Sequence, residues 1–348
     1  MNHHTSVSPM GAVLFFDTIP VFARFQWLNS PQVVDILGRF LHPPQRGRRG
    51  YNKTLLFRWI LYKQVMRCSY RDLESMTGID YSTFIKFRKR LTASFLLSRI
   101  LQSLAVCIAQ KKPLRLILDS SFVETYSTHH ETGSEYNGYK KKNGFKLHTL
   151  IDYETRLPVL QHATGGARAD VIWGHNLIRG TPKEWEVKSL TADKGYDSEA
   201  FVQNIKAKWK KAKVGIPLRR TNQEKVACRP ESWLNRWLKS LPRTWSRKLL
   251  NSRTEIERYF SRKKYVFHLG EERTRGIKNF EANCSMTSIM EHLEYIARLL
   301  ALFTKLNIRR LTARAAGGIC GSLKKSQRRI PSYFSGMCSD DFRIQLPA

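Results

Sequence analysis

Apolar residues recur at helical spacing through the first hundred positions of the chain. Residues 31–41 and 53–68 carry apolar side chains three and four positions apart, as one face of an α-helix requires. A connector rich in Pro, Gly and Arg separates the two stretches. The pattern predicts an N-terminal all-α domain over residues 1–110.

The stretch after residue 68 has the form of a helix-turn-helix. Ser69 can cap a first helix that Gly78 ends, and Asp80 or Ser82 can start the second. A solvated basic face is the alternative to DNA contact, because many helix pairs with short turns never touch DNA. The second helix would present four cations to a DNA groove or to phosphates: Lys86, Arg88, Lys89 and Arg90.

Strand-like runs replace the helical pattern after residue 110. Residues 114–118 form a short apolar run of the kind found in buried strands. An alternation of strands and helices predicts an α/β fold with a mixed sheet flanked by helices. The elements expected after the first strand are a hairpin over 144–151 and 157–162, a helix over 171–178, a strand over 187–192, a helix over 198–208 and a strand over 214–218.

A basic, Trp-rich stretch over about 219–250 interrupts this alternation. Its tryptophans could stack on bases or pack in the interior. A long apolar helix over about 285–306 closes a second domain, which we place at 111–306. The basic tail over 307–348 contains Gly and Ser and is expected to be mobile.

Charge bears on partners more than on fold. The 348 residues include 60 Lys and Arg against 28 Asp and Glu, a formal net charge of +32, which favours nucleic acid as the partner over an anionic membrane surface. No apolar run approaches the ~20 residues of a membrane span, so a soluble, intracellular chain is expected. The six cysteines show neither zinc-ligand nor disulfide spacing and are expected to be reduced thiols.

Three carboxylates stand where a metal ligand would be useful. Asp119 follows the apolar run, where a buried carboxylate is costly unless it binds something; a strand-ending turn residue is the alternative. Asp193 follows the strand at 187–192, at the end where open α/β sheets present ligand-binding groups, whereas Asp197 suits a helix N-cap. We expect Asp170 to be a helix cap as well.

Glu257 lies in a predicted helix, with Arg253 four residues before it and Lys264 seven after. These offsets place the three within roughly 60° of one another, while Glu255 points away from their stripe. A surface Arg–Glu pair is the alternative. Three carboxylates can hold two divalent cations for phosphoryl transfer, so the pattern favours metal-dependent cutting and joining of DNA. Lys146 and the lysine run before it could hold phosphates or simply be solvated.

The segments at 118–120, 191–198 and 253–260, together with Lys264, resemble the DDE transposases of bacterial insertion sequences, and more narrowly their four/five superfamily. The resemblance implies a ribonuclease-H-like catalytic core in which Asp119, Asp193 and Glu257 are both the catalytic residues and the ligands of two Mg²⁺ or Mn²⁺ ions. It also implies that Arg253 and Lys264 contact the element end. The family pattern often has a DNA-holding Tyr where this chain has Leu250, and this departure argues against a hairpin-forming route of cleavage.

The implied function is a transposase that binds the ends of an insertion sequence and catalyses metal-dependent cleavage and strand transfer. Its expected partners are double-stranded DNA, both terminal inverted repeats and target, and a second copy of the chain as a homodimer on DNA. A cytoplasmic, nucleoid-associated location in a bacterial or archaeal cell is expected. Two other functions stay open: a non-catalytic DNA-binding protein acting as a repressor, and a metal-dependent nuclease without strand transfer.

Overall fold

The computed structural model describes residues 26–41, 50–109, 113–125, 131–217, 251–271 and 275–316. The Trp-rich stretch predicted at 219–250 and residues 317–348 of the predicted tail lie outside these ranges. In chain order the elements are η2 (Gln26–Asn29), α2 (Pro31–Leu41), α3 (Lys53–Met66), α4 (Tyr70–Thr77), α5 (Tyr81–Ala93), α6 (Leu96–Ala109), β1 (Leu114–Glu124), β2 (Glu135–Asn137), β3 (Lys142–Asp152), β4 (Pro158–Gly165), α7 (Asp170–Gly180), β5 (Val187–Ala192), η3 (Lys194–Tyr196), α8 (Glu199–Lys208), β6 (Lys213–Gly215), α12 (Thr254–Tyr265) and α13 (Ile277–Ala316).

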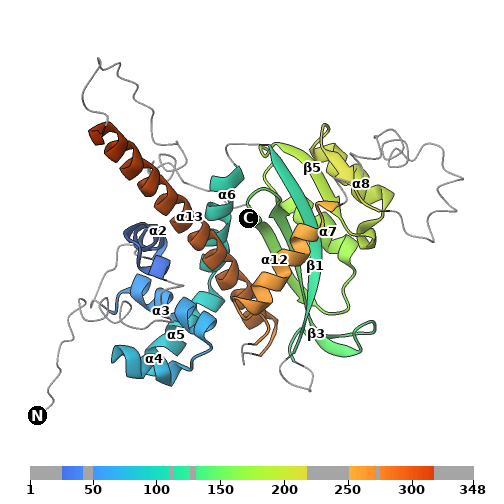
Figure 1. Ribbon diagram of the computed structural model, residues 1–348. Coiled ribbons are helices and arrows are strands. Elements are labelled where there is room, and N and C mark those ends of the chain that lie inside the picture. Colours follow the sequence, from blue (N-terminus) through green and yellow to red (C-terminus); the bar gives the residue numbers. More distant parts are fainter. Residues whose placement is uncertain are drawn as a thin grey trace, which may run out of the picture.

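Strand β1 lies at the centre of a mixed sheet (Figure 1). It pairs antiparallel with β3 on one side and parallel with β5 on the other. The order across the sheet is β4–β3–β1–β5–β6, with the short β2 beside the start of β3. An antiparallel half followed by parallel strands, with α7 and α8 as crossovers, is the ribonuclease-H-like arrangement, which confirms the predicted fold class.

The sequence-based bounds are close for most elements, but β1 is longer than expected. It continues for five residues beyond Asp119, to Glu124, so Asp119 lies inside the strand and not at its end. Alternate residues of β1 serve two cores because side chains on a strand alternate between faces. Leu116 and Leu118 pack towards α7 and α8, whereas Ile117 and Val123 pack towards α12 and α13.

The N-terminal helices confirm the predicted capping. Ser69 Oγ accepts a hydrogen bond from the Asp72 amide at 3.1 Å, and Gly78 ends α4 with a positive φ of 69° that suits glycine. Asp80 then caps α5 by accepting from the Ser82 amide at 2.7 Å. The helix pair of the predicted helix-turn-helix is therefore present, and its contact with DNA stays a prediction.

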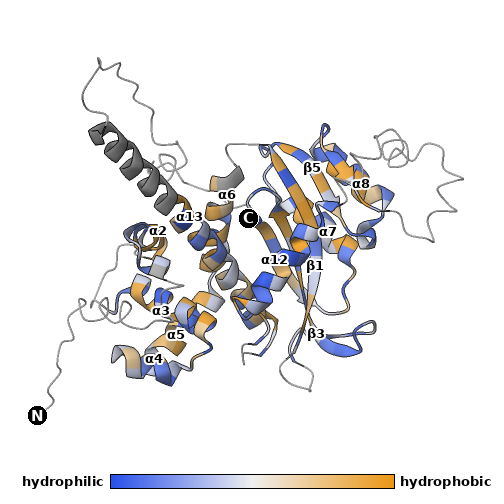
Figure 2. Cartoon of the chain, viewed as in Figure 1, coloured by the Kyte–Doolittle hydropathy of each residue, from blue (hydrophilic) through white to orange (hydrophobic). Residues whose placement is uncertain are grey.

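Helix α13 joins the two halves of the molecule. It begins at Ile277, eight residues before the predicted start, and its backbone stays helical to Ala316, through the first ten residues of the predicted tail. Met286, Ile289 and Leu293 on this helix belong to the same buried cluster as the N-terminal helices. Hydrophobic residues, orange in Figure 2, gather along the strands and on the surfaces between helices. The predicted domain limit at 110 thus divides a shared core.

A buried ion pair ties α12 to α13. Lys263 is fully buried, and its ammonium donates to the Tyr259 hydroxyl at 2.8 Å, to Ser288 Oγ, and to Glu291 Oε2 at 3.4 Å. Ser288 in turn donates to Gln161 of β4 at 2.7 Å. Burial lowers the pKa of Lys263 and raises the pKa of Glu291, so each charge depends on the other for its stabilisation.

Replacing Lys263 alone should therefore destabilise the chain strongly. We expect Lys263→Met to lower the free energy of unfolding by about 3–5 kcal/mol, because Glu291 is left as a buried unpaired charge. The double variant Lys263→Met, Glu291→Leu should recover most of this loss. Urea unfolding followed by circular dichroism measures both. A double variant no more stable than the single one would mean that the hydrogen bonds to Tyr259 and Ser288, and not the charge pair, carry the stability.

Candidate active site

Asp119 and Asp193 lie side by side because β1 and β5 pair in parallel. The last paired residues are Leu118 and Ala192, so Asp119 is the next residue of β1 and Asp193 is the first residue after β5. Neighbouring strands stand about 4.8 Å apart, and equivalent positions on parallel strands point to the same side. Asp119 belongs to the face of β1 that Ile117 and Val123 present to α12, the helix that carries Glu257.

The environment of Asp119 disfavours its charge. Burial raises the pKa of Asp119 to about 7; the backbone hydrogen bond from Ser120, at 2.8 Å, and the nearby Arg253 oppose the rise, whereas Asp193 and Asp170 add to it. Carboxylates crowded in this way are stabilised by a cation. The site therefore combines a half-buried acid, Asp119, with a second acid, Asp193, beside it.

Arg253 connects the aspartates to the helix. One end of its guanidinium donates to Asp193 Oδ1, and the other lies 3.4 Å from Glu257 Oε1. Glu257 is otherwise exposed, with 61% of its side chain accessible. Its rival Glu255 is buried and engaged by Arg156 at 2.7 Å and Arg258 at 2.7 Å. Of the two glutamates, Glu257 is the one linked to the aspartates.

Asp170 is a further acid at this site that sequence reasoning had assigned to a helix cap. The N-cap of α7 is Ala169, and Asp170 makes no cap hydrogen bond. Its Oδ1 accepts from Ser120 Oγ at 2.8 Å and from Lys146 Nζ at 3.1 Å. The prediction for Asp197 is wrong in the same way, since Ser198 is the N-cap of α8.

Two buried side chains complete the surroundings of Asp170. His148 Nδ1 lies 3.7 Å from Asp170 Oδ1, but burial lowers the pKa of His148 to about 4, so the ring is neutral at pH 7. Burial also raises the pKa of Tyr196 well above its ordinary value, and Asp170, Asp119 and Asp193 add to the effect. Tyr196 follows Asp193 in the turn of η3. The only sequence signal for Asp170 was its position after the hairpin.

The predicted DNA-binding cations occupy different environments. Lys264 Nζ donates to the Phe122 carbonyl at 3.1 Å, three residues beyond Asp119 on β1. Lys146 is mostly buried and donates to the Arg168 carbonyl at 2.9 Å as well as to Asp170. Arg88 is buried and its guanidinium donates to Asn283 of α13. The exposed cations of α5 are Lys86, Lys89 and Arg90.

Within the described part of the chain, no three His, Cys, Asp or Glu side chains stand in an arrangement that could hold a metal ion. The residues nevertheless fit a divalent cation in kind, because carboxylate oxygens are hard ligands. Asp119 and Asp193 also have suitable positions, since they are adjacent and the charge of Asp193 adds to the cost of ionising Asp119. Glu257 reaches them only through Arg253, so a shared cation requires this guanidinium to move.

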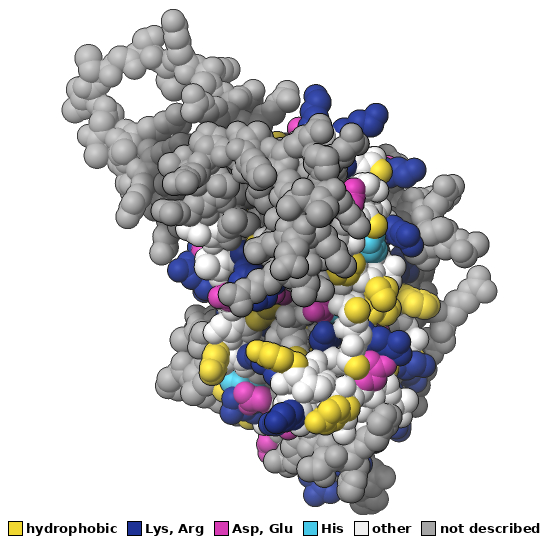
Figure 3. All heavy atoms as spheres, turned by 90° about the vertical axis from the view of Figure 1, so that its right-hand side faces the viewer, with side chains coloured by type: hydrophobic (Ala, Val, Ile, Leu, Met, Phe, Trp, Pro, Cys, Tyr) yellow, Lys and Arg dark blue, Asp and Glu magenta, His cyan; other side chains and the backbone are white. Residues whose placement is uncertain are grey.

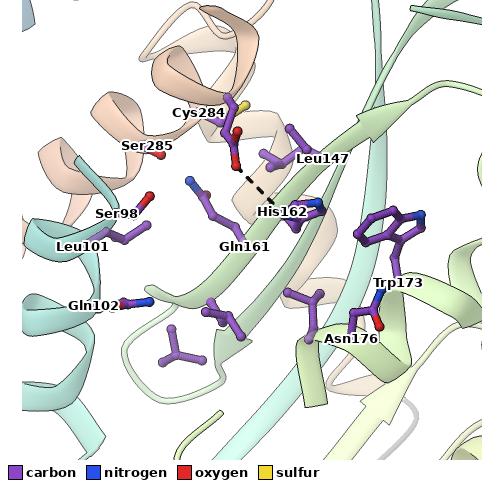
Figure 4. A pocket seen from close by; sticks show the side chains of 15 residues that line it. Ser98, Leu101, Gln102, Leu147, Gln161, His162, Trp173, Asn176, Cys284 and Ser285 are labelled. Carbon is purple, nitrogen blue, oxygen red and sulfur yellow. Dashed lines mark ion pairs between the residues drawn. The ribbon is translucent and has the colours of Figure 1, made fainter. Parts of the chain in front are cut away.

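A separate cavity of about 460 Å³ lies beside the edge strand β4, between α6, α7 and α13 (Figure 4). The His162 ring stacks on Trp173 at 4.4 Å, and its Nδ1 lies 3.9 Å from Glu281 Oε1. Burial lowers the pKa of His162. None of the sequence-predicted site residues lines this cavity. It is therefore distinct from the aspartate cluster.

Positive charge is not confined to the site. Figure 3 shows Lys and Arg side chains spread over the described part of the face seen from the right of Figure 1. None of the described helices is long and apolar enough to cross a membrane.

A ribonuclease-H-like sheet that places Asp119, within β1, beside Asp193, just past the end of β5, with a glutamate-bearing helix packed on the same face, defines a class of phosphoryl-transfer fold. The family model described as "Transposase DDE domain" matches residues 110–290. The chain belongs to this family of DDE transposases, as its resemblance in sequence implied.

The chain is also similar to a solved structure, a piggyBac transposase in a cryo-EM synaptic complex with hairpin DNA. The two are 14% identical with a TM-score of 0.33 over 64% of this chain and 54% of that one, so this chain spans about half the length of that relative. Among curated proteins, none matches the chain.

The crowding of Asp119 predicts a pH-dependent gain in stability for Asp119→Asn in the absence of divalent cations. Its pKa rises from 3.8 to about 7 on folding. The protonated Asp119 therefore contributes its full share of the free energy of unfolding below about pH 4, and this contribution is lost as pH rises through 7. At pH 8 the variant should be more stable by up to about 4 kcal/mol. The gain should shrink towards pH 5.

Urea unfolding at pH 5 and pH 8 in EDTA measures this difference. Asp35→Asn, which removes an exposed carboxylate on α2, is the control and should show no pH-dependent gain. An Asp119→Asn variant equally destabilised at both pH values would mean that the carboxylate is held by hydrogen bonds that favour its charged form.

Proposed function

We propose that this transposase binds the ends of its DNA element and catalyses metal-dependent cleavage and strand transfer, with Asp119, Asp193 and Glu257 as the metal ligands. The observation that carries the proposal is the placement of Asp119 beside Asp193, with Arg253 linking Asp193 to Glu257. Family membership supports the reaction class.

Two Mg²⁺ or Mn²⁺ ions would lower the pKa of a bound water or DNA 3′-hydroxyl and stabilise the leaving oxygen. The protein's own contribution is positioning and charge. The β1–β5 pairing fixes the aspartates, and the docking of α12 through Lys263 fixes the approach of Glu257. Arg253 neutralises these acids in the absence of metal and, once released, is close enough to hold a phosphate.

Double-stranded DNA is the proposed partner, both as element end and as target. The formal charge of +32 supports strong, salt-dependent binding. Within α5, the exposed Lys86, Lys89 and Arg90 suit phosphate or groove contact, whereas Arg88 anchors this helix to Asn283. A homodimer on DNA stays a prediction.

The proposal predicts separable effects on binding and cleavage. Asp193→Ala and Glu257→Ala should each abolish Mg²⁺- or Mn²⁺-dependent nicking of a plasmid that carries the DNA flanking the coding sequence. DNA affinity should stay within about twofold, because these changes leave the positive charge intact. Agarose gels measure nicking and joining, and fluorescence anisotropy measures affinity.

Asp35→Asn serves as a control and should nick at the wild-type rate. Normal nicking by Glu257→Ala would remove Glu257 from the site. Nicking without joined products would favour a nuclease, and specific binding with no nicking by the wild-type chain would favour a non-catalytic repressor.

Lys264 should contribute one phosphate contact. Lys264→Ala should therefore weaken binding to an element-end duplex and reduce the slope of log K against log salt concentration by about one. Lys188→Ala removes an exposed lysine near the opposite end of β5 from Asp193 and should leave the slope unchanged. Anisotropy titrations from low to physiological salt give both slopes. Equal slopes for wild type and Lys264→Ala would make Lys264 a structural link to Phe122.

A further inference from the structure

The β2–β3 hairpin presents exposed tyrosines and lysines to solvent. Tyr139 is 90% exposed and Tyr136 58% exposed. The three lysines at positions 140–142 are exposed as well. Figure 1 shows the hairpin end of β3 at the lower right, below α7 and α12, and Figure 2 shows it as predominantly hydrophilic. An aromatic ring left in water on such a surface is available to a ligand.

The turn that carries Tyr139 is held in one conformation. Asn137 Oδ1 accepts hydrogen bonds from the amides of Tyr139 at 3.1 Å and Lys140 at 3.0 Å, and its amide nitrogen donates to the Gly166 carbonyl at 2.7 Å. The Lys140 ammonium lies 5.4 Å from the centre of the Tyr139 ring. Because the turn is already ordered, binding here would lose little conformational entropy.

The C-terminal end of α12 adds a further tyrosine, Tyr265, and a further lysine, Lys264, to this surface. Tyr265 is 80% exposed and follows Lys264, whose ammonium is fixed to the Phe122 carbonyl. Phe122 pairs with Lys146 and Glu124 with Gly144, so the residue that holds Lys264 lies beside the start of β3, close to the hairpin turn. Burial lowers the pKa of Lys264, and the charge of Lys140 lowers it further. Lys140 of the hairpin and Lys264 of α12 therefore contribute positive charge to the same surface.

Strand β1 sets the distance from this region to the aspartates. Lys264 is bound at Phe122, three residues beyond Asp119, and Lys142 pairs at 2.6 Å with Glu124, five residues beyond. At about 3.3 Å per residue these offsets correspond to roughly 10 and 17 Å. A DNA strand with a rise of about 3.4 Å per nucleotide covers this span in roughly three to five nucleotides.

Lysines alone would bind any DNA, but exposed tyrosine rings distinguish unpaired from base-paired DNA. Bases in a duplex already stack on one another, so their faces are closed to a side chain. Unpaired bases have open faces, and stacking on an aromatic ring contributes about 1–3 kcal/mol per base. Positive charge along the same surface holds the backbone that connects those bases.

We propose that the hairpin surface, formed by Tyr136, Tyr139, Lys140, Lys141, Lys264 and Tyr265, binds an unpaired stretch of DNA strand three to five nucleotides from the phosphate that reacts at Asp119 and Asp193. Tyr139 supplies the stacking platform and the lysines hold the phosphates. The position relative to the reacting phosphate rests on the proposed function, whereas the preference for unpaired DNA does not.

The test measures binding by the full chain in EDTA, so that no cleavage step intervenes. Three fluorescein-labelled probes of one sequence are compared: a single strand of about 20 nucleotides, its duplex, and the duplex with three adjacent unpaired positions. Tyr139→Ala should weaken binding to the single strand and to the interrupted duplex about fivefold or more, and binding to the intact duplex by less than about twofold.

Matched variants separate stacking from charge and from folding. Tyr139→Phe keeps the ring and should bind all three probes as the wild type does. Lys141→Ala should weaken all probes by a similar factor, and Phe95→Ala, which removes a ring that is 84% exposed outside the hairpin, should change none. Thermal unfolding should be the same for both Tyr139 variants and the wild type.

Equal affinities of Tyr139→Ala and wild type for the single strand would overturn the inference, as would an equal loss on all three probes. Loss of affinity in Tyr139→Phe as well would assign the effect to the hydroxyl and not to stacking, and so would also overturn it. These outcomes are independent of the proposed reaction, which fails instead if the Asp193 and Glu257 variants still nick DNA in the presence of divalent cations.

Discussion

The parallel pairing of β1 with β5 is the constraint on which the site depends. It brings together two aspartates that stand 74 positions apart in the sequence, because the last pair of the ladder, Leu118 with Ala192, comes directly before both of them. Burial of the Asp119 carboxylate beside a second acid is unfavourable for its charge: burial first, and then the charge of Asp193, raises the pKa of Asp119. The hydrophobic clusters on both faces of the sheet supply the free energy that keeps the strands paired despite this repulsion.

The position of the third carboxylate, Glu257, depends on a different kind of contact. Glu257 lies on α12, whose inner face carries Ile256, Tyr259 and Phe260 against the sheet and Lys263 against Glu291 of α13. A hydrophobic face alone would let a helix slide, whereas a buried ion pair with specific hydrogen-bond partners selects one position. Arg253 at the start of the helix then completes the link by donating to Asp193 and approaching Glu257.

Local patterns were enough to predict most of the elements, whereas the roles of Asp119 and Asp193 as metal ligands stay a prediction. Val187–Ala192 and Pro31–Leu41 have the predicted bounds, because apolar spacing and flanking polar residues are local properties. Asp170 was missed because its role depends on Ser120 and Lys146, which reach it only after β1, β3 and α7 have assembled. Arg88 was predicted on the exposed face although it stands one turn after Phe84 and one turn before Leu91, both of them buried. That spacing was the signal for its burial.

The N-terminal helices and α13 share one hydrophobic core, which holds them rigidly together. Residues of α13 fill the space between α2, α3 and α5, and the same helix contacts β4 and is bonded to α12 through Glu291. The exposed cations of α5 are thus connected to the helix that carries Glu257 by packed side chains and not by a linker. Close-packed cores deform little, so DNA held on α5 would meet the aspartates at a nearly fixed distance. The fold therefore favours selection of the reacting phosphate by rigid geometry, with Arg253 and the side chain of Glu257 as the parts that must rearrange.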